Sequence, residues 1–229
     1  MKYYGQNGED CVMWALFDKN YIGTFVDVGA LDGKRFSNTY SFELAGWSGI
    51  CVEAHPTYIP YIKKNRPKSH VMHAAASSKD AASVPFYTNK FGSLSTLDGS
   101  MGKYFKTRFG KWFLGHKKVN VPMKTVDTML KEAGIDKVDV VSIDVEGTEI
   151  DVLKGFSLAI YKPEILVLEA LDKNREQQQH EYMKIRKYHF ALKISNNLFF
   201  CRTKEGAAKA RAAKIVNKNM LVHTPHPLH

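Results

Sequence analysis

The sequence predicts an α/β fold built on a mostly parallel sheet, and three observations lead to this prediction. Apolar stretches typical of strands alternate with helical patterns along almost the whole chain. Residues 138–143 are apolar or small on both faces, which is typical of a central strand in a sheet covered on both sides. Residues 190–194 and 198–202 flank Asn196 and Asn197, which tolerate the left-handed turn of a hairpin. An antiparallel hairpin is therefore expected to close the sheet.

Each element is expected from its apolar periodicity and from the residues that cap or break it. In chain order, the first elements are a short helix between Gly8 and Lys19, a strand at 24–28, a helix at 39–45 with Asn38 as N-cap and Gly46 at its end, a strand at 50–53, a helix at 56–65, a strand at 70–74 and a small-residue turn at Ala75 and Ala76. The later elements are a strand at 84–87, a helix that Thr125 caps and Gly134 ends, the strand at 138–143, a helix at 148–154, a strand at 165–168, a polar helix at 173–187 and the hairpin. Because ligands bind at the carboxyl ends of parallel strands in such sheets, functional residues are expected at that edge.

The composition fits one compact domain, expected over residues 1–203 and followed by a basic tail at 204–229. A chain of 229 residues with 44% hydrophobic content can bury one substantial core. Cys11, Cys51 and Cys201 are odd in number and lack metal-ligand spacing, which favours a reducing, cytoplasmic setting over a disulfide framework. The amino terminus has no apolar signal segment and no apolar run is long enough to span a membrane, so neither secretion nor a membrane span is expected.

A glycine turn follows the first strand and is paired with a distant acid. Residues 25–33 read Phe-Val-Asp-Val-Gly-Ala-Leu-Asp-Gly, and Glu53 ends a second apolar run 20 positions after Gly33. This combination is typical of a nucleoside pocket in which the acid binds ribose hydroxyls. The carboxylates of Asp27 and Asp32 repel a pyrophosphate but suit a cation. The pattern therefore favours S-adenosylmethionine, with its ammonium and sulfonium, over NAD; an ordinary strand-to-loop turn is the structural alternative.

Several short motifs extend this pattern over much of the chain. They are Gln-Asn-Gly-Glu-Asp at 6–10, Phe-Val-Asp-Val-Gly-Ala-x-Asp-Gly at 25–33, Ser-Asn-Thr at 37–39, Gly-Trp-x-Gly at 46–49, Val-Glu at 52–53, Asn-Arg at 65–66, Ser-Thr-Leu at 95–97 and Ser-Ile-Asp-Val-Glu-Gly at 142–147. In order and spacing, residues 1 to about 170 resemble the FkbM-type methyltransferases. The resemblance implies S-adenosylmethionine-dependent methylation, usually of a hydroxyl oxygen, on the class I methyltransferase (Rossmann-like) fold with a seven-stranded, mostly parallel sheet. Ala54-His55-Pro56 departs from the family, which more often has proline directly after the acid.

The donor pocket and the catalytic residues follow from this interpretation. The residues predicted to bind the donor are Gln6, Asp27, Gly29, Asp32, Asn38, Glu53 and Ala75. Catalysis is expected at the carboxyl ends of the central strands, where Asp144 is predicted as general base for an acceptor hydroxyl, or as a partner of the donor's charge, and Glu146 is the second candidate. The alternative is that both acids cap the helix that follows.

Magnesium is a second candidate cofactor. Asp144 and Glu169 follow neighbouring strands, an arrangement that resembles the metal-dependent catechol-type O-methyltransferases, and Mg²⁺ prefers oxygen ligands. The alternative is a Glu169 that hydrogen-bonds to a loop or pairs with a lysine.

Basic residues point to an anionic acceptor. The formal net charge is +10, and residues 101–118 interleave lysines and arginine with aromatic rings. This segment is a candidate substrate-recognition element, with a packed amphipathic lid as the alternative. Together with Lys63, Lys64, Arg66 and Lys68, it favours a nucleotide, RNA or phosphorylated sugar. The sequence thus predicts an O-methyltransferase acting on a small molecule, sugar or nucleotide; the alternatives are an RNA ribose 2′-O-methyltransferase, a nucleic-acid-binding module without turnover and, more distantly, a nicotinamide oxidoreductase.

Overall fold

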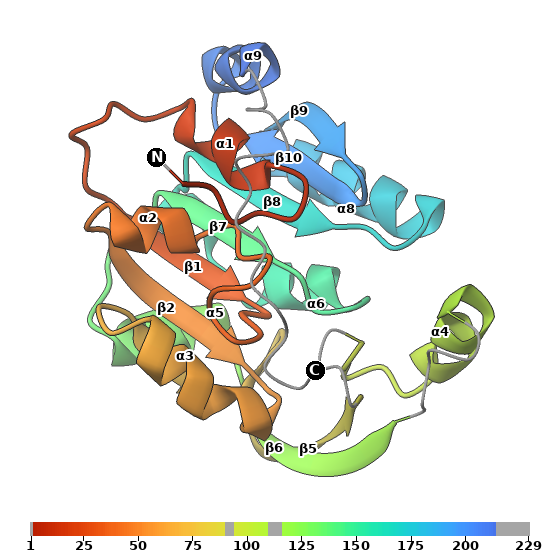
Figure 1. Cartoon of the computed structure of the whole chain (residues 1–229). Coiled ribbons are helices and arrows are strands. Elements are labelled where there is room, and N and C mark those ends of the chain that lie inside the picture. The colour runs from red at the N-terminus through yellow and green to blue at the C-terminus, as the bar shows by residue number, and fades with distance from the viewer. Residues whose placement is uncertain (1, 90–93, 110–115, 214–229) are drawn as a thin grey trace.

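The computed structural model describes residues 2–89, 94–109 and 116–213, and its core is one seven-stranded sheet. The strands of this main sheet are β1 Thr24–Val28, β2 Ser48–Glu53, β3 His70–His73, β7 Val140–Ile143, β8 Ile165–Glu169, β9 His189–Ile194 and β10 Asn197–Cys201. Their order across the sheet is β3-β2-β1-β7-β8-β10-β9 (Figure 1). The first five strands in this order pair in parallel, whereas β10 is antiparallel to both β8 and β9. The predicted mostly parallel sheet with a closing hairpin is confirmed.

Helices cover both faces of the main sheet. One face packs against α5 Val126–Glu132, α6 Glu149–Lys154 and α8 Lys173–Ile185, and the other packs against α1 Glu9–Trp14, α2 Tyr40–Leu44, α3 Ile59–Asn65 and α9 Lys204–Ala212. Successive strand residues point to opposite faces, so Val26 and Val28 join the first core cluster and Phe25 the second. Two short helices, η1 Pro56–Tyr58 and α7 Leu158–Tyr161, complete the connections. The result is a three-layer α/β/α arrangement.

A second, three-stranded sheet follows β3 in the sequence and contacts β2 through β4. It contains β4 Ala75–Ala76, β6 Lys117–Lys124 and β5 Ala81–Thr88 in that order, and α4 Met101–Phe109 lies between β5 and β6 in the sequence (Figure 1). Ala75 pairs in parallel with Met123, so the chain leaves the region of the main sheet and returns beside its point of departure. From this sheet the sequence predicted the strand at 84–87 and a strand near Val119, which are β5 and β6, but not β4.

Three local predictions are corrected by the structure. Ala75 and Ala76 form strand β4 and not a turn, because they pair with β6. Asn38 is not the N-cap of α2; Thr39 holds that position, and the Asn38 amide donates instead to Ser142 Oγ at 3.1 Å. The left-handed residue of the closing hairpin is Ser195, with φ 52°, and Asn197 already belongs to β10.

The segment predicted as a basic tail begins with α9. Thr203 caps this helix by accepting a hydrogen bond from the Gly206 N–H, and Ala207 and Ala210 are buried in the core. The rest of that segment, 214–229, lies outside the described residues. The basic segment at 101–118 contains α4 and the start of β6, while its residues 110–115 also lie outside the description. Within the described ranges, no helix has both the length and the apolar character needed to cross a membrane.

Candidate active site

A cavity of about 200 Å³ lies at the carboxyl ends of β1, β2, β7 and β8. The predicted site residues that line it are Gln6, Asp27, Gly29, Asn38, Glu53, Ala75, Asp144, Glu146 and Glu169. Asp32 is not among the described residues of its lining. The structure thus brings together residues from both halves of the sheet, as the position of parallel strand ends predicts.

Glu53 ends β2 and lies at the side of the cavity. Its two carboxylate oxygens accept hydrogen bonds from the Leu31 N–H at 2.8 Å and the His55 N–H at 2.7 Å. Burial raises the pKa of Glu53 to about 7, although these backbone hydrogen bonds oppose the rise. Each oxygen has a second lone pair, so the carboxylate can also accept hydrogen bonds from a ligand's hydroxyl groups.

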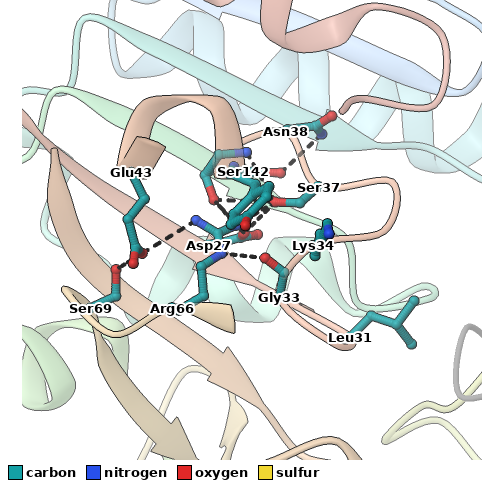
Figure 2. Close-up of polar contacts among 12 residues, drawn as sticks. Asp27, Leu31, Gly33, Lys34, Ser37, Asn38, Glu43, Arg66, Ser69 and Ser142 are labelled. Atoms are coloured by element: carbon teal, nitrogen blue, oxygen red, sulfur yellow. Dashed lines mark hydrogen bonds and ion pairs between the residues drawn. The ribbon is translucent and has the colours of Figure 1, made fainter. Parts of the chain in front are cut away.

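The two acids of residues 25–33, Asp27 and Asp32, are bound by other groups of the protein. Asp27 Oδ2 accepts hydrogen bonds from Thr39 Oγ1 at 2.5 Å and from a guanidinium nitrogen of Arg66 at 3.2 Å (Figure 2). Asp32 Oδ1 accepts from the N–H groups of Lys34 and Arg35, which closes a local turn. The carboxylates that were expected to attract a cation therefore hold the loop together. Arg66, expected among the basic residues that attract an anion, is 1% exposed.

The turn after β1 packs directly against the end of β7. Gly29 has φ +86°, and a Cβ added there would lie 1.8 Å from the carbonyl oxygen of Asp144, so only glycine fits. Further along the loop, the Asn38 amide nitrogen donates to Ser142, whereas its Oδ1 is buried without a hydrogen-bond partner in the described structure. Gln6 reaches the cavity because Gly5 forms a β-bridge with Phe36.

Small and apolar residues form the side of the cavity next to the second sheet. Ala54, Ala75 and Phe86 pack together in one buried cluster and all line the cavity. This apolar surface suits contact with an aromatic ring.

Three carboxylates lie at the other end of the cavity, after β7 and β8. One carboxylate oxygen from each of Asp144, Glu146 and Glu169 lies within 4.8 Å of the others. Among the described residues, none of the three takes part in an ion pair of the usual distance. The Asp144 side chain is open to the cavity.

Crowding of these acids sets their protonation. Burial raises the pKa of Asp144 to about 6, and hydrogen bonding with Glu169 opposes the rise. Burial and the neighbouring carboxylates raise the pKa of Glu169 and of Glu146 well above the usual range, although Arg108 opposes the rise for Glu146. Because these carboxylates are coupled, they lose their protons in steps that belong to the cluster as a whole, and Asp144 has the smaller rise in pKa.

The turn after β7 holds the cluster in place. Glu146 has a left-handed backbone with φ 57°, an uncommon conformation for a residue other than glycine. Thr96 Oγ1 donates to the Glu146 carbonyl at 3.0 Å, and the Gly147 N–H donates to Glu149 Oε1 at 2.9 Å. Neither Asp144 nor Glu146 caps the next helix, because Thr148 is the N-cap of α6.

Sequence reasoning gave no role to several residues that line or support the cavity. These residues are Leu31, Arg35, Phe86, Ser95, Leu97 and Thr148 in the lining and Asn65 behind it. Arg66 was expected only among the basic residues that attract an anion, and it binds the glycine turn instead. The Ser-Thr-Leu and Asn-Arg motifs contained part of this information. The motifs did not reveal which residues their side chains contact, because Thr96 contacts Glu146 and Arg66 contacts Asp27 only in the folded chain.

Comparison with known proteins gives the family of the chain. Residues 27–194 match the methyltransferase FkbM domain. The chain belongs to the FkbM methyltransferase family. It is thus a methyltransferase that uses S-adenosylmethionine, on the class I fold that the strand order describes. No curated protein matches the chain.

Solved structures with a similar course of the chain are also methyltransferases. They are a ribosomal protein L11 methylase from Lactobacillus delbrueckii subsp. bulgaricus (8% identity, 83% of this chain and 74% of that one, TM-score 0.44), a precorrin-6y C5,15-methyltransferase from Geobacter metallireducens (12%, 84% and 85%, 0.43) and a TehB-like SAM-dependent methyltransferase from Corynebacterium glutamicum (10%, 86% and 89%, 0.44). TM-scores below 0.5 indicate a distant similarity, so the family assignment rests on the domain match.

The chemistry of the cavity fits the family's methyl donor. The carboxylate of Glu53 has lone pairs for ribose hydroxyls, and the unpartnered Asn38 Oδ1 requires a hydrogen-bond donor such as an ammonium group. The apolar surface at Ala75 and Phe86 suits a purine ring. When bound, S-adenosylmethionine supplies the methyl group and the sulfur leaving group.

Proposed function

We propose that this enzyme transfers the methyl group to a hydroxyl oxygen of a small-molecule, sugar or nucleotide acceptor, with Asp144 as general base. One observation carries the proposal: Asp144 is open to the cavity at the end of β7, beside two further carboxylates. A pKa of about 6 for Asp144 is consistent with a base that accepts a proton near neutral pH. An alcohol becomes a strong nucleophile as its proton leaves, so a carboxylate at this place favours oxygen as the methyl acceptor.

The donor pocket proposed here keeps most of the residues expected from the sequence. Glu53 accepts hydrogen bonds from the ribose hydroxyls, Asn38 Oδ1 accepts from the donor's ammonium, and Ala75 contacts the adenine. Gln6 and Gly29 complete the lining. Asp27 and Asp32 support the loop, because their carboxylates already have partners inside the fold.

The proposed reaction is an in-line displacement. The acceptor oxygen attacks the methyl carbon as the C–S bond breaks, and Asp144 takes the hydroxyl proton. Alignment of the reactants can supply roughly 7 kcal/mol, whereas a general base adds about 10²-fold to 10⁴-fold in rate. Glu169, whose pKa is raised by burial and by the adjacent carboxylates, stays protonated and supports the Asp144 anion by hydrogen bonding. Glu146 is the second candidate base.

An anionic acceptor, such as a nucleotide, RNA or phosphorylated sugar, is supported by α4. This helix exposes Lys103 and Lys106, and its Arg108 acts electrostatically on Glu146 at the acceptor end of the cavity. The Tyr104 hydroxyl donates to the Leu171 carbonyl at 2.8 Å, which ties α4 to the loop after β8. The most specific version of this proposal is methylation of the ribose 2′-hydroxyl of RNA. The non-catalytic alternative is a protein that binds nucleic acid without turnover.

The test is a methyl-transfer screen with labelled S-adenosylmethionine against hydroxylated metabolites, nucleotides, phosphorylated sugars and short RNAs. A labelled ether product together with S-adenosylhomocysteine would support the proposal. A product labelled on nitrogen, carbon or sulfur would contradict it. Salt-sensitive retention of RNA without either product would favour the binding module.

The same screen decides whether magnesium takes part. The three carboxylates after β7 and β8 offer the oxygen ligands that Mg²⁺ prefers, so each acceptor is assayed with magnesium and with a chelator. Activity that the chelator abolishes and magnesium restores would assign the cluster to a metal; activity that survives the chelator would assign it to proton transfer.

A cytoplasmic setting is also proposed. It is supported by Cys11, Cys51 and Cys201, which are buried free thiols.

A further inference from the structure

The residues Asn65 and Arg66 reach from the end of α3 onto the glycine turn that follows β1. The Asn65 side-chain amide donates to the carbonyl oxygen of Asp32 at 2.9 Å. Arg66 Nε donates to the carbonyl oxygen of Gly33, as Figure 2 shows. Two successive side chains thus bind two successive carbonyls, 33 residues earlier in the chain. Neither side chain belongs to the described lining of the cavity, so any effect on a ligand passes through the turn.

A second part of the Arg66 guanidinium joins both ends of the same loop. The terminal nitrogen Nη2 donates to Asp27 Oδ2 at 3.2 Å, to Thr39 Oγ1 at 2.8 Å and to Ser37 Oγ at 2.5 Å (Figure 2). Asp27 lies in β1, before the loop, Ser37 lies near the end of the loop, and Thr39 is the N-cap of α2, after it. One buried side chain therefore fixes the beginning, the middle and the end of the loop.

The loop needs such support because its backbone is strained. Leu31 and Phe36 have φ values of 51° and 58°, in the left-handed region that residues with side chains rarely adopt. Backbone strain of this kind persists only where surrounding contacts over-determine it. Asn65 and Arg66 bind between these two positions, and Glu53 holds the Leu31 N–H.

The supported loop presents the groups that meet the donor. Ser37 and Asn38 line the cavity, and the unpartnered Oδ1 of Asn38 follows directly after the hydroxyl that Arg66 binds. A shift of Ser37 would move Asn38 with it. The position of Asn38 Oδ1 therefore depends on a side chain that does not touch the cavity.

We propose that the Asn65–Arg66 pair is a positioning element for the methyl donor, which sets donor affinity by holding the loop from Gly29 to Asn38 in its binding shape. The pair acts through the carbonyls of Asp32 and Gly33 and through Ser37. The ion pair with Asp27 neutralises a buried charge and places few demands on the shape of the loop. Hydrogen bonds to two consecutive carbonyls, in contrast, fix the path of the loop backbone. This inference is independent of the acceptor and of the proposed base.

The experiment uses the whole protein and three variants, Arg66→Lys, Asn65→Ala and Glu43→Gln. Lysine keeps the positive charge beside Asp27 but lacks the fork that binds several acceptors at once. Asn65→Ala removes only the hydrogen bond to Asp32 and keeps the test open if Arg66→Lys fails to fold. Glu43→Gln is the matched control, because Glu43 lies 3.6 Å from Arg66 Nη1 and is not part of the described cavity lining.

The expected result is a loss of donor affinity without a loss of turnover. Calorimetric titration with S-adenosylhomocysteine should give a dissociation constant about tenfold higher for Arg66→Lys and about threefold higher for Asn65→Ala, with kcat at saturating donor unchanged. Glu43→Gln should lower the melting temperature and leave the dissociation constant at the parent value. The proposal is overturned if every test variant that folds keeps the parent's dissociation constant for S-adenosylhomocysteine. It is also overturned if Glu43→Gln raises that constant as much as the test variants do.

Discussion

The cavity has two ends, and the carboxylates at these ends have different surroundings. At the end formed by β1 and β2, Asp27 is bound by Arg66 and by hydroxyl groups, and Glu53 accepts two backbone N–H groups. At the end formed by β7 and β8, three carboxylates cluster without an ion pair in the described structure, namely Asp144, Glu146 and Glu169. At the first end, Asp27 supports the loop and Glu53 keeps lone pairs for a ligand, whereas the acids at the second end have no ion pair among the described residues.

This difference teaches that the count of acids near a pocket does not give the charge that a ligand meets. Asp32 holds the loop, and Asp27 lines the cavity but is paired with Arg66, so the lining acids without an ion pair in the described structure are Glu53, Asp144, Glu146 and Glu169. Desolvation raises the pKa of both Glu53 and Asp144, and the backbone hydrogen bonds that Glu53 accepts offset this rise only in part.

The largest effect is expected from Asp144→Asn at the acceptor end. The variant keeps the shape of the side chain and loses the base, so kcat should fall by about 10²-fold to 10⁴-fold. Donor binding, measured by titration with S-adenosylhomocysteine, should stay within about threefold of the parent. In the parent, kcat/KM should rise as pH increases through about 6, where Asp144 ionises. A kcat equal to that of the parent would exclude Asp144 as the base.

A large effect on stability is expected from Glu149→Gln, close to the same cluster. Burial raises the pKa of Glu149 to about 7 from its usual 4.5, so the folded state prefers the neutral acid. The stability that protonation contributes is complete below about pH 4.5 and is lost as pH rises through 7. Because a glutamine side chain cannot ionise, the variant should exceed the parent in stability by up to about 3 kcal/mol at pH 8 and by little at pH 4.5.

Calorimetric melting temperatures between pH 4.5 and 8 measure this difference. Glu181→Gln, a change to an exposed acid of α8, is the control and should leave the slope against pH as in the parent. A parent and Glu149→Gln variant with parallel pH curves would contradict the assigned cause.

A smaller effect, on the donor alone, is expected from Glu53→Ala. The variant loses the proposed ribose partner and frees the N–H groups of Leu31 and His55. Donor affinity should fall by about tenfold to a hundredfold, because hydrogen bonds to a charged group contribute about 1.5–3 kcal/mol. The dissociation constant for S-adenosylhomocysteine measures this change. An unchanged constant would remove Glu53 from the donor site.

The smallest effect is expected from Asp32→Asn, at the same end. Asparagine keeps the side-chain oxygen that accepts from the Lys34 and Arg35 N–H groups, and the carboxylate does not face the described cavity. Donor affinity should change by less than about twofold, and the free energy of unfolding by less than about 1 kcal/mol. Both are measured beside Glu53→Ala under the same conditions. A loss of affinity as large as that of Glu53→Ala would erase the contrast between scaffold and binding acids.

The strand ends were predictable from the sequence, and the partners of the side chains were not. Apolar runs locate β1, β2, β7 and β8, so the positions of Glu53, Asp144 and Glu169 at their carboxyl ends follow from local pattern. The ion pair between Asp27 and Arg66 joins residues 39 positions apart, and no periodicity records such a contact.

Short elements also depended on distant partners. Ala75 and Ala76 have no strand pattern of their own, and they form β4 because β6 pairs with them 48 positions later. The helix α9 had a local signal, since Thr203 precedes a run of good helix formers, but the surrounding lysines suggested a solvated tail.

The pairing of Ala75 with Met123 makes residues 77–122 a natural cassette. The two joints of this stretch lie side by side, so it can be exchanged between relatives without cutting any strand of the main sheet. The cassette brings Phe86, Ser95 and Leu97 to the cavity, whereas Glu53, Asp144 and the Arg66 contacts come from outside it. Exchange of this stretch would therefore replace the cavity wall at Phe86, Ser95 and Leu97 and leave the acids at the strand ends in place.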